Sequence, residues 1–329
     1  MFDKKVFVSR IFPEIGINLL KDEGFHVTEW NEDRPMAQDE LIMEAQKHNA
    51  LFCTVTEKID KRFLNACSHL EIISQYAVGY DNIDISEATK LGITVSFTPG
   101  AMTDATADTA FGLMIATSRK MFYLHKKIIN GQWDYFRPTG DLGIELKNKT
   151  LGIFGMGRIG FEMAKRCQGA YRMKIVYHDL VRNSKAENEL DAGFMGVEDL
   201  LAESDIISVH CQLSEQTRGI FNKEAFRKMK PGSIFINTSR GQVHNEEDLI
   251  EALKIGEIWG AGLDVTNPEP MYQDNPLLQM ENVCVLPHIG SATEEARNAM
   301  SRLAAENIIE YYKNGKVPHI VNPEVLKSK

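Results

Sequence analysis

An arginine, a glutamate and a histidine in the second half of the chain have the residue types that acid–base chemistry needs. Arg240 and His288 each follow a short apolar stretch typical of a buried strand, and Glu269 lies in a proline-containing segment between them. Ligands of open α/β sheets bind outside the carboxyl ends of the strands, so all three side chains are expected at one crevice. A guanidinium can bind a carboxylate with two parallel hydrogen bonds. A histidine beside a carboxylate is held in one tautomer and has a raised pKa, which suits a general acid near neutral pH.

Each of these three residues also has an ordinary structural interpretation. Arg240 could cap the segment that follows it, Glu269 could be a solvated loop acid, and His288 could be a hydrogen-bonded turn histidine. The residue types alone leave both interpretations open for each side chain.

A glycine-rich segment indicates a nucleotide site. Residues 150–154 read as a buried strand, which is followed by G-x-G-x-x-G with Gly155, Gly157 and Gly160. The first glycine permits a tight turn, the second lets a pyrophosphate approach the backbone, and the third lets the following helix pack closely on the strand. Free N–H groups at the N-terminus of that helix would meet the negative charge.

An acidic residue stands where a ribose-binding acid is expected. A second strand is predicted over 174–178, and Asp179 follows it, about 20 residues past the glycines. A carboxylate there would repel the 2′-phosphate of NADP, so NAD(H) is favoured over NADP(H). Arg182 is the nearby residue that could favour NADP(H) instead.

A second candidate binding loop lies in the first part of the chain. The segment 76–84 follows a predicted strand over 70–74, and Gly79 within it could expose backbone N–H groups to an anion. An ordinary turn would have the same composition, so both interpretations stay open.

Strands and helices alternate along the chain, which predicts two α/β units in series, each with a parallel sheet covered by helices. Strands are expected at 6–8, 25–30, 50–54, 70–74, 94–96, 150–154, 174–178, 205–210, 233–237, 258–263 and 283–286. Further helices are expected at 14–22, 40–47, 223–229, 246–254 and 293–312. The last of these is long, amphipathic and without a strand partner, so we infer that it crosses back to the first unit.

Two helices and an aromatic segment connect the two units. Residues 104–119 are apolar nearly all round, which is typical of a buried helix, and 122–130 continue as a second helix. The irregular segment that follows carries Trp133, Tyr135 and Phe136. These aromatic side chains predict either a surface for self-association or local packing.

The bulk composition argues against several classes of function. With 329 residues, 43% of them hydrophobic, the chain can bury the cores of about two domains. A net charge of −9 argues against nucleic acid or an anionic membrane as a partner. No apolar run is long enough to span a bilayer, and the N-terminus reads directly as a strand, without the apolar region of a signal peptide.

The cysteines indicate a reducing compartment. Five cysteines are scattered through apolar surroundings without a C-x-x-C pair, which is typical of buried, reduced thiols in a cytoplasmic protein. The sequence contains no zinc-type ligand cluster, so no metal site is predicted.

Together these motifs resemble the D-isomer-specific 2-hydroxyacid dehydrogenase family, over essentially the whole chain. The likeness rests on the glycine motif with Asp179, and on the segments NTSRG at 237–241, DVTNPEP at 264–270 and PHIG at 287–290. The segments YAVGYDNID at 76–84 and TDATAD at 103–108 are especially similar to the glyoxylate and hydroxypyruvate reductase branch.

The resemblance implies a fold of two Rossmann-like, doubly wound parallel-sheet domains. The substrate-binding domain would be flavodoxin-like and discontinuous, with residues 1–99 and 293–329. The NAD-binding domain would span 100–292, and through it two copies of the chain would form a homodimer.

The resemblance also implies roles for single residues. Arg240 would bind the substrate carboxylate and polarise its keto group, His288 would protonate the developing alkoxide, and Glu269 would orient His288 and keep it protonated. Backbone amides of Val78 and Gly79 would hold the carboxylate. The cofactor phosphates would meet Thr106 and the turn at Arg158 and Ile159. The nicotinamide would contact Thr238 and Asp264. His210 and Gly290 complete the predicted cofactor site.

Two positions depart from the family pattern. Gln212 stands where the family usually has proline, which leaves the shape of the loop near the adenosine end open. His244 and Asn245 stand where the family usually has Val-Asp, and an asparagine can replace an aspartate as a helix N-cap.

The sequence thus predicts an NADH-dependent reductase that converts a small 2-oxo acid of the glyoxylate or hydroxypyruvate type into the D-2-hydroxy acid. The substrate side chain would be selected around Thr54, Val55 and the aromatic segment. A phosphoglycerate- or phosphite-type dehydrogenase of the same family would share the Arg-Glu-His set. A non-catalytic NADH-sensing binding protein could use the same fold, and turnover with any 2-oxo acid would separate that class from the enzymes.

Overall fold

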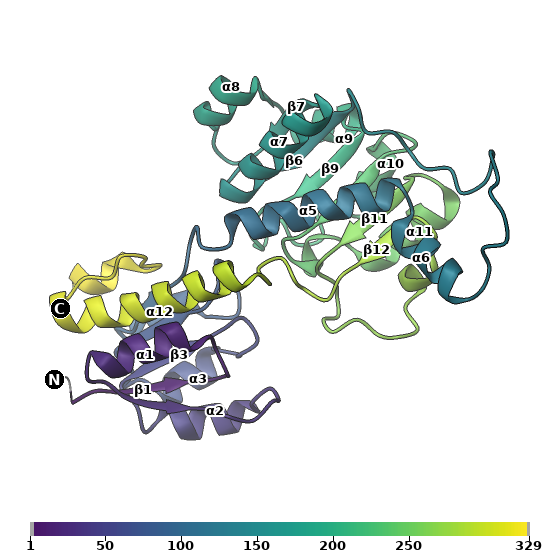
Figure 1. The fold of residues 1–329 in the computed structure, drawn as a ribbon. Helices are drawn as coiled ribbons and strands as arrows, with labels where there is room; N and C mark the ends of the chain where they lie inside the picture. The colour runs from purple at the N-terminus through teal and green to yellow at the C-terminus, as the bar shows by residue number, and fades with distance from the viewer. Residues whose placement is uncertain (1–2, 328–329) are drawn as a thin grey trace. The chain divides into compact units, whose positions relative to one another are not determined.

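The computed structural model describes residues 3–327, which form two compact units (Figure 1). The first unit contains the described residues up to Met102 together with those from Ala292 onward. The second unit contains Thr103–Ser291. Each unit has one parallel sheet with a hydrophobic core on both faces, which confirms the predicted fold class.

The first unit is built on a five-stranded parallel sheet in the order β2-β1-β3-β4-β5, the flavodoxin-like order. Its strands are β1 (Lys5–Val8), β2 (His26–Glu29), β3 (Ala50–Cys53), β4 (Ile72–Gln75) and β5 (Thr94–Ser96). Its helices are α1 (Glu14–Asp22), α2 (Gln38–Ala45), α3 (Lys61–Ala66), α4 (Ile85–Lys90), α12 (Glu294–Asn314) and the 3₁₀ turn η3 (Pro323–Lys327).

The apolar runs in these strands follow from burial on both faces. Along β1 and β3, Val6, Val8 and Phe52 belong to the core on one face of the sheet, while Phe7 and Leu51 belong to the core on the other. Successive side chains of a strand point to opposite faces, so a strand covered on both sides is apolar throughout.

Helix α12 packs against α1, although nearly the whole chain separates the two helices in sequence (Figure 1). The hydroxyl of Ser301 donates a hydrogen bond to the carbonyl of Pro13 (2.7 Å) and accepts one from the N–H of Gly16 (3.2 Å). A Cβ atom at Gly16 would overlap Ser301, so glycine is needed for this close approach. The N-terminal part of the chain and the returning helix therefore share one core.

The second unit is built on a seven-stranded parallel sheet in the order β12-β11-β10-β9-β6-β7-β8. Its strands are β6 (Thr150–Phe154), β7 (Lys174–His178), β8 (Gly193–Phe194), β9 (Ile206–Val209), β10 (Ile234–Asn237), β11 (Gly260–Leu263) and β12 (Val283–Val285). Its helices are α5 (Thr103–Ser118), α6 (Met121–Ile129), α7 (Arg158–Tyr171), α8 (Ser184–Leu190), α9 (Val197–Glu203), α10 (Lys223–Lys228) and α11 (Glu246–Ile255), with the 3₁₀ turns η1 (Gly241–Val243) and η2 (Pro276–Gln279).

The order of this sheet creates a switch point between β6 and β9. The chain proceeds from β6 outward through β7 and β8 on one side, and from β9 through β10, β11 and β12 on the other. In open α/β sheets, ligands bind outside the carboxyl ends of the strands at such a switch point.

Helix α5 packs on the sheet of the second unit and on α7. Its residues Ala107, Ala110, Leu113 and Met114 are buried in the core, as predicted from its apolar surface. Among residues 3–327, no helix is both long and apolar enough to cross a membrane.

Candidate active site

The glycine turn of the second unit lies at the switch point, directly after β6. Gly155 has a φ of 99°, in the left-handed region, and a Cβ there would press on the backbone of Cys211. Gly157 is the N-cap of α7, and apart from the residue itself and its two chain neighbours no described heavy atom lies within 4 Å of the position its Cβ would take. A Cβ at Gly160 would overlap the carbonyl oxygen of Gly155. A tight turn, an open approach and close helix–strand packing are what a pyrophosphate needs, so these residues fit a nicotinamide dinucleotide.

The predicted ribose acid stands at the end of the next strand. Asp179 follows β7 and is half-buried, and its carboxylate accepts a hydrogen bond from the N–H of Leu180 (2.7 Å). The guanidinium of Arg182 donates from Nε to Glu187 (2.9 Å) and lies over the ring of Phe194. The positive charge of Arg182 is therefore already paired within the protein.

His210 and Thr238 lie at neighbouring strand ends on the other side of the switch point. The two ring nitrogens of His210 contact hydroxyls, Nε2 that of Ser208 (2.8 Å) and Nδ1 that of Thr238 (3.4 Å). Burial lowers the pKa of His210 to about 3, so the imidazole is neutral at physiological pH.

Asp264 and Thr106 hold the turn that carries the predicted catalytic histidine. The Asp264 carboxylate follows β11 and accepts hydrogen bonds from the N–H groups of Ile289 and Gly290, both at 2.7 Å. Thr106 donates to the carbonyl of Gly290 (3.0 Å). Burial raises the pKa of Asp264, and the two N–H groups oppose that rise. The sequence did not indicate these contacts, because Thr106 and Asp264 lie far from residue 290 along the chain.

His288 and Glu269 form a hydrogen-bonded pair through Nδ1 of the imidazole and Oε1 of the carboxylate. His288 has a φ of 54°, a left-handed conformation that is uncommon for a residue other than glycine and is often found at functional sites. Burial raises the pKa of Glu269, but the hydrogen bond from His288 and the nearby charges of His288 and Arg240 outweigh burial, so the pKa is lowered. The side chains of His288 and Glu269 are 33% and 41% exposed, which leaves the pair accessible to a small molecule.

The Arg240 loop is organised by a buried amide at the end of β10. Asn237 donates from Nδ2 to the carbonyl of Arg240 (2.9 Å), and its Oδ1 accepts from the N–H and hydroxyl of Ser239 (both 2.9 Å). Nδ2 of Asn237 also lies 3.0 Å from Nδ1 of His244, one of the residues that departs from the family pattern. Burial lowers the pKa of His244 to about 4, so its ring is a neutral acceptor. Buried Asn237 and His244 thus support the Arg240 loop, a role that their positions in the sequence do not indicate.

Val78 and Gly79, the predicted carboxylate-binding pair, lie in the first unit, in the turn after β4. Both residues are half-buried, and their backbone N–H groups donate no hydrogen bond to the residues that the structure describes. A pocket of about 480 Å³ lies at the same edge of this sheet, and Arg10, Thr54 and Tyr76 are among the residues that line it. Arg10, Thr54 and Tyr76 follow β1, β3 and β4, so this pocket lies at the switch point of the five-stranded sheet.

The structure thus gathers the predicted residues in three groups. One group in the second unit is a connected set of six residues: Arg240, Glu269, His288, Asp264, Thr106 and Gly290. The second group surrounds the switch point and contains the glycine turn, Arg158 and Ile159 in the first turn of α7, and His210 and Thr238. Val78 and Gly79 belong to the first unit. Residues 3–327 contain no group of three or more His, Cys, Asp or Glu side chains that could hold a metal ion.

Comparisons with known proteins identify the family of the chain. Residues 111–290 match the model of the D-isomer specific 2-hydroxyacid dehydrogenase NAD-binding domain. The chain is 44% identical to a glyoxylate reductase of Thermococcus litoralis over 328 residues, which cover 98% of both chains.

Two solved structures share the fold over nearly their whole length. A glyoxylate reductase from Paecilomyes thermophila superimposes with a TM-score of 0.88 at 29% identity, covering 98% of this chain and 100% of that one. An NADPH-dependent glyoxylate/hydroxypyruvate reductase from Sinorhizobium meliloti, in complex with NADP and malonate, superimposes with a TM-score of 0.85 at 27% identity, covering 97% of each chain. The chain therefore belongs to the D-isomer specific 2-hydroxyacid dehydrogenase family, a family of nicotinamide-dependent oxidoreductases.

Proposed function

We propose that this protein reduces a small 2-oxo acid of the glyoxylate or hydroxypyruvate type to the D-2-hydroxy acid, with NADH as the reductant. The observation that carries the proposal is the His288–Glu269 pair beside Arg240. This pair belongs to a chain that is 44% identical to a glyoxylate reductase. NADH supplies a hydride to the carbonyl carbon of the substrate.

His288 is the proposed proton donor. Its Nδ1 is engaged by Glu269, so Nε2 is the ring nitrogen that can face a substrate oxygen. Reduction consumes one hydride and one proton, and the proton passes from Nε2 of the imidazolium to the alkoxide oxygen. The ring then takes up a proton from water. The Glu269 carboxylate, whose lowered pKa keeps it ionised, stabilises the imidazolium before the transfer.

Arg240 and the amides of Val78 and Gly79 are the proposed carboxylate ligands. A guanidinium matches the two oxygens of a carboxylate and can also polarise the adjacent keto group. The N–H groups of Val78 and Gly79 have no acceptor among the described residues, so they are available to donate hydrogen bonds to the oxygens of the carboxylate. Substrate bound at these groups would be oriented before the proton and hydride arrive.

NADH rather than NADPH is proposed because of the charges after β7. Asp179 places a carboxylate where the ribose hydroxyls are expected, and a 2′-phosphate there would meet like charge. Arg182, the cation nearest in sequence, is paired with Glu187. The Sinorhizobium meliloti relative is NADPH-dependent, so both cofactors belong in the test.

Two copies of the chain are proposed to associate through the second unit. The segment that follows α6 exposes large apolar side chains, with Trp133, Tyr135 and Phe136 at 70%, 62% and 82% exposure. Exposed aromatic side chains gathered on one segment are typical of a protein–protein contact.

Steady-state oxidation of NADH and NADPH, with glyoxylate, hydroxypyruvate, pyruvate and phosphohydroxypyruvate as acceptors, tests the activity. We expect glyoxylate or hydroxypyruvate to give a kcat/KM of about 10⁴ M⁻¹s⁻¹ or more with NADH, and a lower value with NADPH. Tight NADH binding without turnover of any 2-oxo acid would overturn the reductase and favour a sensor. Reduction of NAD⁺ by phosphite in that case would identify a different dehydrogenase of the same family.

A further inference from the structure

The turn that carries Val78 and Gly79 contains no helix or strand of its own, so its shape must be fixed by other contacts. The N–H of Val78 shares a peptide group with the carbonyl of Ala77, which accepts a hydrogen bond from the N–H of Thr98 (2.9 Å). This bond fixes the peptide before Val78. The peptide that follows Gly79 needs a separate anchor.

Gln75 supplies that anchor. It is the last residue of β4 and is fully buried, and its side-chain amide donates to the carbonyl of Gly79 (3.2 Å) and to Oδ1 of Asn82 (2.8 Å). Its Oε1 accepts the thiol hydrogen of buried Cys53 (3.3 Å), which determines which end of the amide faces the turn. The N–H of Gly79 therefore lies between two anchored peptide groups.

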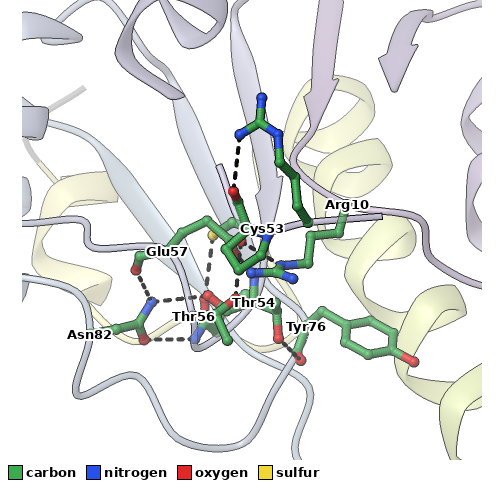
Figure 2. Close-up of polar contacts among 10 residues, drawn as sticks. Arg10, Cys53, Thr54, Thr56, Glu57, Tyr76 and Asn82 are labelled. Atoms are coloured by element: carbon green, nitrogen blue, oxygen red, sulfur yellow. Dashed lines mark hydrogen bonds and ion pairs between the residues drawn. The ribbon is translucent and has the colours of Figure 1, made fainter. Parts of the chain in front are cut away.

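Asn82 ties this turn to the turn that follows β3. Its Nδ2 donates to the carbonyl oxygens of Thr54 (3.1 Å) and Glu57 (2.8 Å). Figure 2 shows Asn82 joined by dashed lines to the segment that carries these two residues. The side-chain amide of Asn82 thus joins the two turns through Nδ2, while its Oδ1 accepts from Gln75.

Glu57 fixes the turn after β3 in the same way. Its side chain is 2% exposed, and its carboxylate accepts hydrogen bonds from Nε of Arg10 (2.9 Å), the N–H of Thr54 (2.7 Å) and the hydroxyl of Thr56 (3.1 Å) (Figure 2). Arg10 follows β1, so one connected set of side chains ties together the turns after β1, β3 and β4. A buried carboxylate with these partners is stable only in one geometry, because losing a partner leaves a buried charge unpaired.

We propose that Gln75 and Asn82 are positioning residues that hold the N–H groups of Val78 and Gly79 in the arrangement that binds the substrate carboxylate. This inference rests on the proposed reduction of a 2-oxo acid. Donors that are already oriented lose less free energy on binding an oxyanion than donors in a mobile turn. The amides of Gln75 and Asn82 act through the backbone and touch no substrate.

Replacing Gln75 by methionine tests the role of the amide, because methionine has a similar length and no hydrogen-bonding amide. We expect Q75M to raise the KM for glyoxylate about tenfold, with a smaller change in kcat and an unchanged Kd for NADH. N82D is the second variant: it keeps the acceptor for Gln75, loses both donors to the turn after β3, and should raise KM in the same direction.

Q75E separates positioning from packing. An ionised glutamate still accepts from Cys53 but cannot donate to Gly79, whereas a protonated one regains a single donor. The KM of Q75E divided by that of Q75M should therefore fall as the pH is lowered. A packing defect would leave this ratio constant.

Asn322 provides the matched control. It is a fully buried amide of the same unit that donates to the carbonyl of Ile93 (2.9 Å) and accepts from the N–H of Val95 (2.8 Å), at the amino end of β5 rather than at the turn. N322L should lower the melting temperature without raising the KM for glyoxylate. An unchanged KM in both Q75M and N82D, or an equal rise in N322L, would overturn the inference. Lack of wild-type turnover with every 2-oxo acid would instead contradict the proposed function.

Discussion

Proton transfer in the proposed reaction depends on the imidazole of His288. We expect H288A to lower kcat for glyoxylate reduction by about 10² to 10⁴, the usual contribution of a positioned acid. NADH binding, measured by fluorescence titration, should be unchanged, because the glycine turn after β6 lies at a separate strand end. A variant that turns over as fast as the wild type would remove His288 from the mechanism.

The charge of Glu269 predicts how the reaction depends on pH. Its lowered pKa keeps the carboxylate ionised well below neutral pH, so the charge is present wherever the neighbouring imidazole gains or loses a proton. Glutamine at this position can keep the hydrogen bond but removes the charge that stabilises the imidazolium. Reduction requires the protonated ring, so kcat/KM of E269Q should lie below that of the wild type at every pH at which Glu269 is ionised. Overlapping profiles between about pH 5 and pH 10 would contradict this role for Glu269.

At the scale of the elements, the packing of α7 against β6 requires glycine at position 160 but not at position 169. A Cβ at Gly160 would overlap the carbonyl of Gly155, whereas a Cβ at Gly169 on the same helix meets nothing within 4 Å among the described residues. We expect G160A to destabilise the protein by about 1–3 kcal/mol and to weaken NADH binding. G169A should stabilise it by about 0.5–1 kcal/mol, because alanine is the better helix former. Thermal unfolding of both variants checks the opposite signs, and a stabilised G160A would show that the turn is not tightly packed.

The elements also show what the sequence could predict. Long apolar runs such as those of β6 and β10 identify buried parallel strands, because such strands have no polar face. Strand β8 was not predicted: it has two residues, both exposed, at the edge of the sheet, and so has no apolar pattern.

Some parts of the site could not be predicted because they depend on contacts between distant segments. Gly155, Gly157 and Gly160 have a spacing with a physical meaning, and their surroundings match it. Glu57, in a polar segment, has the composition of a solvated loop acid, yet its side chain is buried against Arg10 from another strand end. The roles of Arg240, Glu269 and His288 stay predictions that the variants above test.

At the scale of the whole molecule, the aromatic segment after α6 predicts the oligomeric state. Light scattering should give the mass of two 37.1 kDa chains for the wild type. F136D should shift this mass toward that of one chain, because a buried, unpaired carboxylate at an interface is unfavourable. Ile255, 57% exposed at the end of α11, offers a matched control, and I255D should keep the wild-type mass. A single-chain mass for the wild type would contradict the proposed association.

The sharing of one core by α1 and α12 has a consequence for synthesis on the ribosome. All strands of the second unit lie within one continuous stretch, so its sheet can form as soon as residue 285 has left the exit tunnel. The first unit must wait, because Met300, Ala304 and Ile308 cover the same core as Val6 and Phe52. At about 5–20 residues per second, the roughly 200 residues made in between take about 10–40 s. During this time the first-made strands expose an apolar face, so the unit whose strands are translated first is the unit that finishes folding last.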